Sequence, residues 1–230
     1  MPSRKKLSRS LNHPARDALK RAKLYLILDT EVRNYDSLFE IAQQAALNGV
    51  DVLQLRDKKG NAKDILNFCK GLLKFLRQNS PDVPLIVNDR VDLALAAGAG
   101  GVHLGQEDLS IAFARKILGP QALIGASCQN LKQAQLAEGE GADYIGFGSV
   151  FKTKTKPRRS PMDLKLLEEV FQKIKIPVFA IGGIDPQNAA VLQRSGVRRI
   201  AVCRAVCEMK DVKQATKALK EKMAWINSST

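Results

Sequence analysis

Residues 85–90 read LIVNDR, and three strand-forming apolar residues there run directly into an amide, a carboxylate and a guanidinium. Apolar, β-branched runs of this kind are typical of strands that are buried on both faces of a parallel sheet. The same pattern, an apolar run that ends in polar residues, recurs along the chain. The order of these runs indicates the fold class, and the residues at their ends predict a site.

From Lys23 onward, short apolar runs alternate with helix-like segments. The apolar runs cover residues 24–28, 51–55, 84–88, 101–104, 122–126, 143–147, 177–181 and 199–203. The clearest helical patterns between them cover residues 37–49, 64–78, 131–141, 163–174 and 186–196. Eight strands alternating with helices favour a single closed (β/α)8 TIM barrel of the α/β class. An open, doubly wound sheet is the alternative.

Turn residues stand where these helices should begin and end. Asn48-Gly49, Gly141 and Gly196 lie at predicted helix C-termini, where glycine is favoured. Asp185-Pro186 offers an N-cap followed by proline at the first helical position. No linker interrupts residues 24–230, so we predict one barrel domain there, preceded by a basic extension over residues 1–23.

The formal net charge is +14, and it is unevenly distributed. Residues 1–23 carry eight Lys or Arg against one Asp, a net +7, and residues 152–159 (KTKTKPRR) carry five basic residues and no acid. Such charge suits nucleic acid, an anionic membrane surface or a phosphorylated small molecule. The extension has an Arg-rich composition like that of transit peptides, but we interpret it as a solvated arm that ends in a short helix at Pro14.

No apolar run approaches the ~20 residues that span a bilayer. The four cysteines form no CxxC motif, and their spacing does not suggest a disulfide framework. We therefore expect a soluble, cytoplasmic protein whose cysteines are reduced thiols.

Polar residues gather at the carboxyl ends of the predicted strands, where barrel enzymes place their active sites. Cations there suit phosphate oxygens, and carboxylates suit Mg²⁺. Gly182-Gly183 would let an anion approach the backbone N–H groups of the next helix. These side chains are Gln54, Arg56, Lys58, Asn88, Asp89, Asp108, Ser127, Thr153, Lys154, Thr155 and Lys156. They predict a magnesium-bound pyrophosphate, with a second phosphate after the seventh and eighth strands.

Each feature also has a structural explanation. Asp108 could serve only as a helix N-cap, and Arg56 and Asp57 could form an ion pair at the barrel rim. A histidine on a strand, such as His103, is more often packed in a core than catalytic. The coincidence of all the polar groups at strand ends favours the functional interpretation.

Four segments carry a resemblance to thiamine phosphate synthases. They are QLRDK (54–58), LIVNDRVDLALAAGAGGVHLGQEDL (85–109), GADYIGFGSVFKTKTK (141–156) and AIGGI (180–184). The resemblance implies a (β/α)8 transferase that joins 4-amino-2-methyl-5-hydroxymethylpyrimidine diphosphate to hydroxyethylthiazole phosphate, free or carboxylated. The products would be thiamine phosphate and pyrophosphate, formed by a dissociative mechanism with Mg²⁺ as the cofactor. Two phosphorylated small molecules are then the expected partners, and assembly into a homo-oligomer is left open.

The resemblance also assigns roles to single residues. Asp89 and Asp108 would bind Mg²⁺. The catalytic cations would be Arg56, Lys58 and Lys156. The pyrimidine diphosphate would contact Gln54, Leu55, Arg56, Asp57, Lys58, Asn88, Ser127 and Lys156. The thiazole phosphate would contact Thr153, Lys154, Thr155, Gly183, Cys203 and Arg204.

The chain departs from the family pattern at four positions. Ser149 and Lys152 replace two prolines, Gln129 stands where a histidine is frequent, and Arg204 stands where serine is frequent. A thiazole tautomerase is the alternative within the same fold, although we would expect it to lose part of the pyrophosphate and magnesium set that this sequence keeps. A nucleic-acid-binding or regulatory barrel is the alternative from another class, and an aromatic content of 5% without a recognisable motif argues against it.

Overall fold

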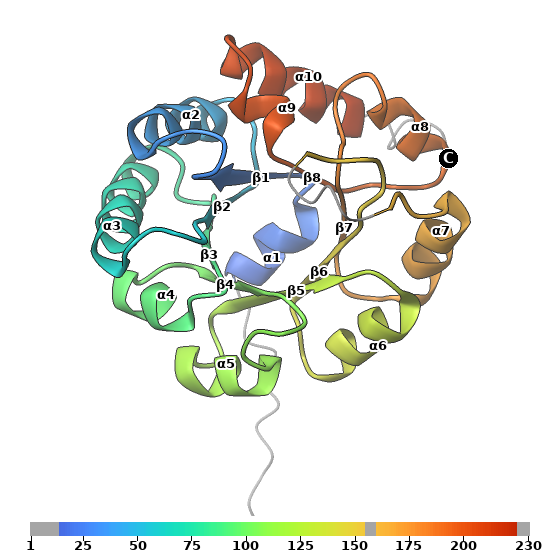
Figure 1. The fold of residues 1–230 in the computed structure, drawn as a ribbon, viewed down its shortest axis with the longest axis horizontal. Helices are drawn as coiled ribbons and strands as arrows, with labels where there is room; N and C mark the ends of the chain where they lie inside the picture. Colours follow the sequence, from blue (N-terminus) through green and yellow to red (C-terminus); the bar gives the residue numbers. More distant parts are fainter. Residues whose placement is uncertain (1–13, 155–159, 225–230) are drawn as a thin grey trace, which may run out of the picture.

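The computed structural model describes residues 14–154 and 160–224. Eight parallel strands pair in sequence order, and the eighth pairs again with the first, so that the sheet closes into a barrel (Figure 1). The strands are β1 (Leu24–Asp29), β2 (Val52–Arg56), β3 (Leu85–Asn88), β4 (Gly101–Leu104), β5 (Leu123–Cys128), β6 (Tyr144–Phe147), β7 (Val178–Ile181) and β8 (Ile200–Val202). The prediction of a closed (β/α)8 barrel is confirmed, and the pairing of β1 with β8 excludes the open sheet.

A ring of helices surrounds the barrel (Figure 1). These are α2 (Tyr35–Leu47), α3 (Ala62–Asn79), α4 (Val91–Ala97), α5 (Ile111–Leu118), α6 (Leu131–Gly139), α7 (Leu164–Lys173), α8 (Ala189–Arg194), α9 (Arg204–Cys207) and α10 (Val212–Ala224). Helix α8 begins at Ala189 and not at Pro186. The Asp185 carboxylate still accepts from the N–H groups of Gln187 and Asn188 (2.9 Å each), as a capping aspartate does. Within the described ranges, no helix is both long enough and apolar enough to cross a membrane.

Side chains alternate between the two faces of each strand, as β geometry requires. On β1, Leu24, Leu26 and Leu28 belong to the core between the barrel and the helices, whereas Tyr25 and Ile27 belong to a separate cluster inside the barrel. Both faces are therefore buried, which explains why the strands are nearly continuous apolar runs in the sequence.

Three aromatic rings form a floor inside the barrel. Tyr25, Tyr144 and Phe179 have ring centroids 5.4 to 5.8 Å apart. Gly125 on β5 makes room for this floor, because a Cβ atom at that position would lie 2.1 Å from the ring of Tyr144.

Helix α1 (Pro14–Arg21) lies across the N-terminal end of the barrel and is seen through its centre in Figure 1. Leu19 is 2% exposed and packs in the inner cluster. Arg16 Nε donates to Asp143 at the start of β6 (2.6 Å). The helix expected at Pro14 is thus present, but it is packed against the barrel and is not part of a solvated arm. Residues 1–13 lie outside the described part of the chain.

Candidate active site

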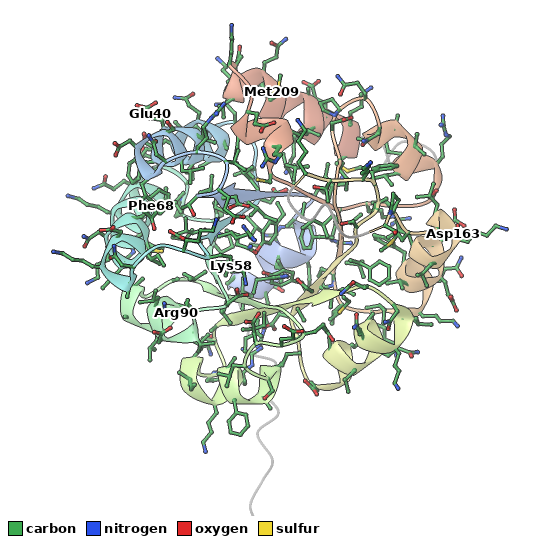
Figure 2. All side chains as sticks on the ribbon, viewed as in Figure 1. Glu40, Lys58, Phe68, Arg90, Asp163 and Met209 are labelled. Atoms are coloured by element: carbon green, nitrogen blue, oxygen red, sulfur yellow. The ribbon has the colours of Figure 1, made fainter. Side chains whose placement is uncertain are left out.

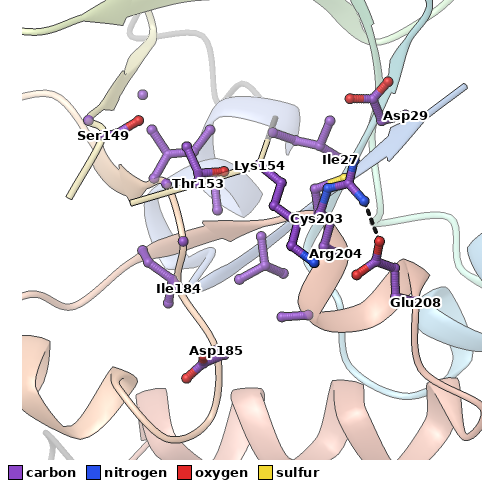
Figure 3. Close-up of a pocket in the computed structure, with 18 of the residues that line it drawn as sticks. Ile27, Asp29, Ser149, Thr153, Lys154, Ile184, Asp185, Cys203, Arg204 and Glu208 are labelled. Atoms are coloured by element: carbon purple, nitrogen blue, oxygen red, sulfur yellow. Dashed lines mark hydrogen bonds and ion pairs between the residues drawn. The ribbon is translucent and has the colours of Figure 1, made fainter. Parts of the chain in front are cut away.

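A cavity of about 720 Å³ opens at the C-terminal ends of the strands (Figure 3). Its volume lies within the range of small-molecule sites. Residues from the ends of β2, β3, β5, β6, β7 and β8 converge on it. The predicted site residues that line it are Gln54, Arg56, Asn88, Ser127, Thr153, Lys154, Gly183, Cys203 and Arg204.

Other predicted residues take different positions. Leu55 is 1% exposed and packs outward against the helices, because it neighbours the inward-facing Gln54 on β2. The Asp57 carboxylate accepts from the Tyr35 hydroxyl and from two backbone N–H groups of its own turn (2.9 and 2.6 Å). Neither side chain lines the cavity. Thr155 and Lys156 lie outside the described residues.

Arg56 is held by two carboxylates, neither of which is Asp57. Its Nη1 atom donates to both oxygens of Asp29 (2.9 and 2.8 Å) and to Glu31 (3.0 Å). Burial opposes the guanidinium charge, but the two carboxylates outweigh it and raise the pKa of Arg56. Within the described ranges, the bonds of the guanidinium all run through Nη1, so its Nε and Nη2 donors are available to a phosphate.

Lys58, Asp89 and Asp108 form a cluster at the rim of the barrel. The Lys58 ammonium donates to Asp89, and Asp108 interacts with the same carboxylate. Burial raises the pKa of Asp89, and Asp108 raises it further, against a lowering effect of Lys58. Figure 2 shows Lys58 over the barrel, whereas Glu40 and Asp163 lie on the helix ring. Two neighbouring carboxylates whose charges repel each other are a donor set that fits a hard cation such as Mg²⁺.

The backbone of Asp89 adopts a left-handed turn directly after β3. Its φ is 60°, which makes it the one non-glycine residue with positive φ in the described ranges. Aspartate tolerates this conformation better than most residues. Its N–H donates to the carbonyl of His103 on the adjacent strand (2.8 Å), which fixes the turn.

A chain of hydrogen bonds crosses the barrel interior below the cavity. Tyr25 Oη donates to Gln54 Oε1 (2.8 Å), and Tyr144 Oη lies 2.9 Å from Tyr25 Oη. His103 Nδ1 lies 3.2 Å from Tyr144 Oη, and its Nε2 lies 3.0 Å from Ser127 Oγ. Each tyrosine has one proton. Because Tyr25 uses its proton on Gln54, Tyr144 must donate to Tyr25, and His103 Nδ1 must donate to Tyr144.

This order fixes the polarity of the groups that face the cavity. With a neutral imidazole, His103 Nε2 is an acceptor, so the Ser127 hydroxyl donates its hydrogen bond to Nε2 and its oxygen remains an acceptor toward a ligand. At the other end, Gln54 Nε2 donates to Asn88 Oδ1 (3.1 Å). The amide NH₂ of Asn88 is thereby left to donate, which suits an anion.

The loop after β6 is tied to the end of β7. Val150 N donates to Ile181 O, and Phe151 N donates to Gly182 O (2.9 Å each). A Cβ atom on Gly183 would lie 2.4 Å from the Lys152 carbonyl, so only glycine fits there. Ser149 and Lys152, the two replacements of proline, therefore lie in a segment that β7 holds in place.

Cys203 and Arg204 directly follow β8 and line the cavity, across from Ser149 (Figure 3). The Arg204 guanidinium pairs with Glu208 one helical turn later. A hydrogen bond with Cys207, together with burial, raises the pKa of the Cys203 thiol, which disfavours the thiolate form.

The prediction from sequence missed Asp29, His103 and Glu208. Asp29 directly follows the first apolar run, so the strand-end rule that found Asn88 could have found it. Glu208 stands four residues after Arg204, a spacing that places both on one helix face. The role of His103 had no sequence signal, because it depends on neighbours from β5 and β6.

Comparison with known proteins identifies the family. The model of the family described as thiamine monophosphate synthase matches residues 24–206. A thiamine-phosphate synthase of Clostridium novyi (strain NT) is 43% identical over 198 residues, which cover 86% of this chain and 96% of that protein. The thiamine-phosphate synthase of Ruminiclostridium cellulolyticum is 38% identical over 198 residues, with coverage of 86% and 93%.

A solved structure agrees with these relatives. The thiamine phosphate pyrophosphorylase of Pyrococcus furiosus has a TM-score of 0.81 to this structure at 37% identity, with coverage of 93% of this chain and 99% of that one. The sequence and the structure of this chain therefore match those of its relatives over most of the length of both chains. The chain belongs to the thiamine monophosphate synthase family, whose members are transferases of thiamine biosynthesis.

Proposed function

We propose that the chain condenses 4-amino-2-methyl-5-hydroxymethylpyrimidine diphosphate with hydroxyethylthiazole phosphate, free or carboxylated, in a Mg²⁺-dependent, dissociative reaction. One observation carries the proposal beyond family membership. Arg56 and Asn88 line the cavity, and the cluster of Lys58, Asp89 and Asp108 lies at the rim, where Lys58 and Asp89 follow these two residues in the same loops.

These residues would receive the diphosphate. Its oxygens would accept hydrogen bonds from Nε and Nη2 of Arg56, from the Lys58 ammonium and from the NH₂ group of Asn88. The negative charge on pyrophosphate grows as its bond to the pyrimidine methylene breaks, so these donors bind more tightly in the transition state than in the ground state. Mg²⁺ held by Asp89 and Asp108 would add positive charge at the same leaving group.

The rest of the cavity would orient the two rings. Gln54 is fixed by Tyr25 and Asn88, and Ser127 presents an acceptor, so both can hydrogen-bond the pyrimidine edge. Lys154 and Arg204 supply positive charge on the opposite side, for the phosphate of the thiazole. Holding the thiazole nitrogen toward the pyrimidine methylene would convert a bimolecular encounter into capture within one site.

The direct test mixes purified protein with both substrates and Mg²⁺ and follows thiamine phosphate by chromatography. We expect product that disappears with EDTA and returns with added Mg²⁺. Product formation that EDTA leaves unchanged would remove the metal from the proposal.

A thiazole tautomerase is the second candidate, because His103 lies in the cavity wall with hydrogen bonds at both ring nitrogens and is suited to proton transfer. Absence of thiamine phosphate from folded protein, together with isomerisation of the carboxylated thiazole phosphate followed by its ultraviolet spectrum, would favour this candidate over the synthase.

A further inference from the structure

A second cavity, of about 360 Å³, lies at the opposite end of the barrel from the candidate active site. Helix α1, the end of α7 and the residues that lead into β6, β7 and β8 enclose it. Four basic residues line this cavity, and one acid does: they are Arg16, Lys20, Lys175, Arg199 and Asp143.

The single acid is already neutralised. Asp143 is 9% exposed and accepts from Arg16 Nε (2.6 Å), from Arg115 Nη2 (2.6 Å) and from the N–H of Ile124 (2.8 Å). Two guanidinium groups thus share one carboxylate. This acid has no further capacity to balance Lys175 or Arg199, and Lys20 has only an exposed pair with Asp17 (3.5 Å). The cavity lining therefore carries an excess of positive charge.

Arg199 is the cation in this cavity whose hydrogen-bonding groups are incompletely satisfied. It is half-buried at the start of β8, and its Nη2 donates to the carbonyl of Lys20 at the end of α1 (2.7 Å). Its Nε is buried and has no hydrogen-bond partner among the described residues, and no described carboxylate forms an ion pair with it. Burial, and next the neighbouring Arg198, lower the pKa of Arg199, yet a guanidinium stays charged at neutral pH.

A purely structural role accounts for only part of this arrangement. The bond to Lys20 O caps the C-terminus of α1, which is a common use of arginine. It engages one of the three nitrogens and leaves the buried Nε–H without an acceptor. A buried donor without an acceptor costs free energy, which an anion in the cavity would offset.

We propose that this cavity is an anion site that takes a phosphate group, free or carried by a small organic molecule. Arg199 and the ammonium groups of Lys20 and Lys175 would contact the phosphate. The apolar side of the cavity, formed by Leu19, Phe171, Ile174 and Val178, could pack against an organic substituent. Because Lys20 belongs to α1, Lys175 follows α7 and Arg199 directly precedes β8, the bound phosphate would hold α1 against the barrel.

The test uses backbone amide NMR of the 25.3 kDa chain, because the candidate active site also binds phosphates and must be observed separately. Inorganic phosphate and phenyl phosphate are titrated in turn. Amides of Leu19, Ala142 and Lys175 report on the proposed site, and that of Gly183 reports on the opposite end.

The variant Lys20→Gln/Lys175→Gln removes two exposed charges, and Lys70→Gln/Lys116→Gln is the matched control with the same change in net charge. We expect saturable shifts at the proposed site, with an affinity about fivefold weaker in the first variant and unchanged in the control. Tighter binding of phenyl phosphate would assign the site to organic phosphates, and equal binding to the free ion. Shifts confined to the Gly183 end, or equal affinities in all three proteins, would overturn the proposal.

Discussion

Asp89 combines three features that each cost stability: positive φ, partial burial and a neighbouring carboxylate. Burial and Asp108 raise its pKa, so the ionised form is less favourable in the folded chain than in the unfolded one. Such a group stabilises the fold at pH values below its unfolded pKa, and this contribution is lost as pH rises through the folded pKa. A carboxylate kept in that position at neutral pH is typical of a functional site.

Asp89→Asn tests this reasoning, since asparagine also accepts positive φ. Above the folded pKa of Asp89, we expect the variant to resist urea better than the wild type, because the repulsion by Asp108 is gone. The difference should shrink as pH falls through that pKa and vanish below the unfolded one. Magnesium-dependent turnover should fall about 10²-fold or more. A variant that is less stable at every pH, or that keeps its turnover, would contradict this account.

Asp29 is predicted to position Arg56. Asp29→Asn removes the charge that holds Nη1, so stability should fall by about 1–3 kcal/mol. The kcat should fall and the KM for the pyrimidine diphosphate should rise, because the guanidinium is no longer fixed. Glu31→Gln is the matched control: Glu31 is 36% exposed, and we expect a change within about 0.5 kcal/mol. Reduced stability with unchanged kinetic constants would make Asp29 a structural residue only.

For single residues, the sequence predicts the position of a side chain correctly where that side chain lies at a strand end and acts alone. Arg56 and Asn88 lie in the cavity as predicted, because strand alternation places every second residue inside. Leu55 was assigned with its neighbours as one segment, although the same alternation turns it outward. The hydrogen-bond chain through His103 joins six strands, β1 to β6, and a linear pattern does not show which strands face each other across a closed barrel.

At the scale of elements, α1 is the part whose role the sequence obscured. Its high charge suggested a solvated arm, yet one apolar side chain, Leu19, reaches into the inner cluster beside Tyr25. Three basic residues on eight positions hid this contact, because Arg16 and Lys20 form ion pairs and Arg21 is exposed. The strands were predictable for the opposite reason, since burial on both faces leaves an unbroken apolar run.

Leu19→Ala measures what α1 contributes. We expect the free energy of unfolding to fall by about 2–4 kcal/mol, because the truncation leaves a cavity under the aromatic floor. Leu47→Ala on α2, where the side chain is 54% exposed, should change it by less than about 0.5 kcal/mol. Urea titrations of both variants provide the comparison. Equal effects would show that α1 only rests on the barrel surface.

The whole molecule is one closed sheet, so each strand is paired on both sides and no strand can leave without breaking two ladders. The candidate active site and the α1 end are therefore joined through the same eight strands. A ligand that binds only the folded chain stabilises all of it, by about 2.7 kcal/mol at a hundredfold excess over its Kd. This stabilisation should appear at amides far from the ligand, provided that they exchange only through global unfolding.

Native-state hydrogen exchange with magnesium pyrophosphate tests this coupling. The slowest amides of β1, β2 and β8 near the α1 end should slow by the same factor as those beside the cavity, about 10²-fold at a hundredfold excess over the Kd. Exposed loop amides, which exchange by local motion, should not change and serve as the internal control. If only the amides beside the cavity slow, the barrel opens in parts, and the closed sheet does not make it a single cooperative unit. If the amides of α1 do not slow while those of the strands do, that helix detaches before the barrel unfolds. Its contacts with Asp143 and Arg199 are then weaker than the geometry indicates.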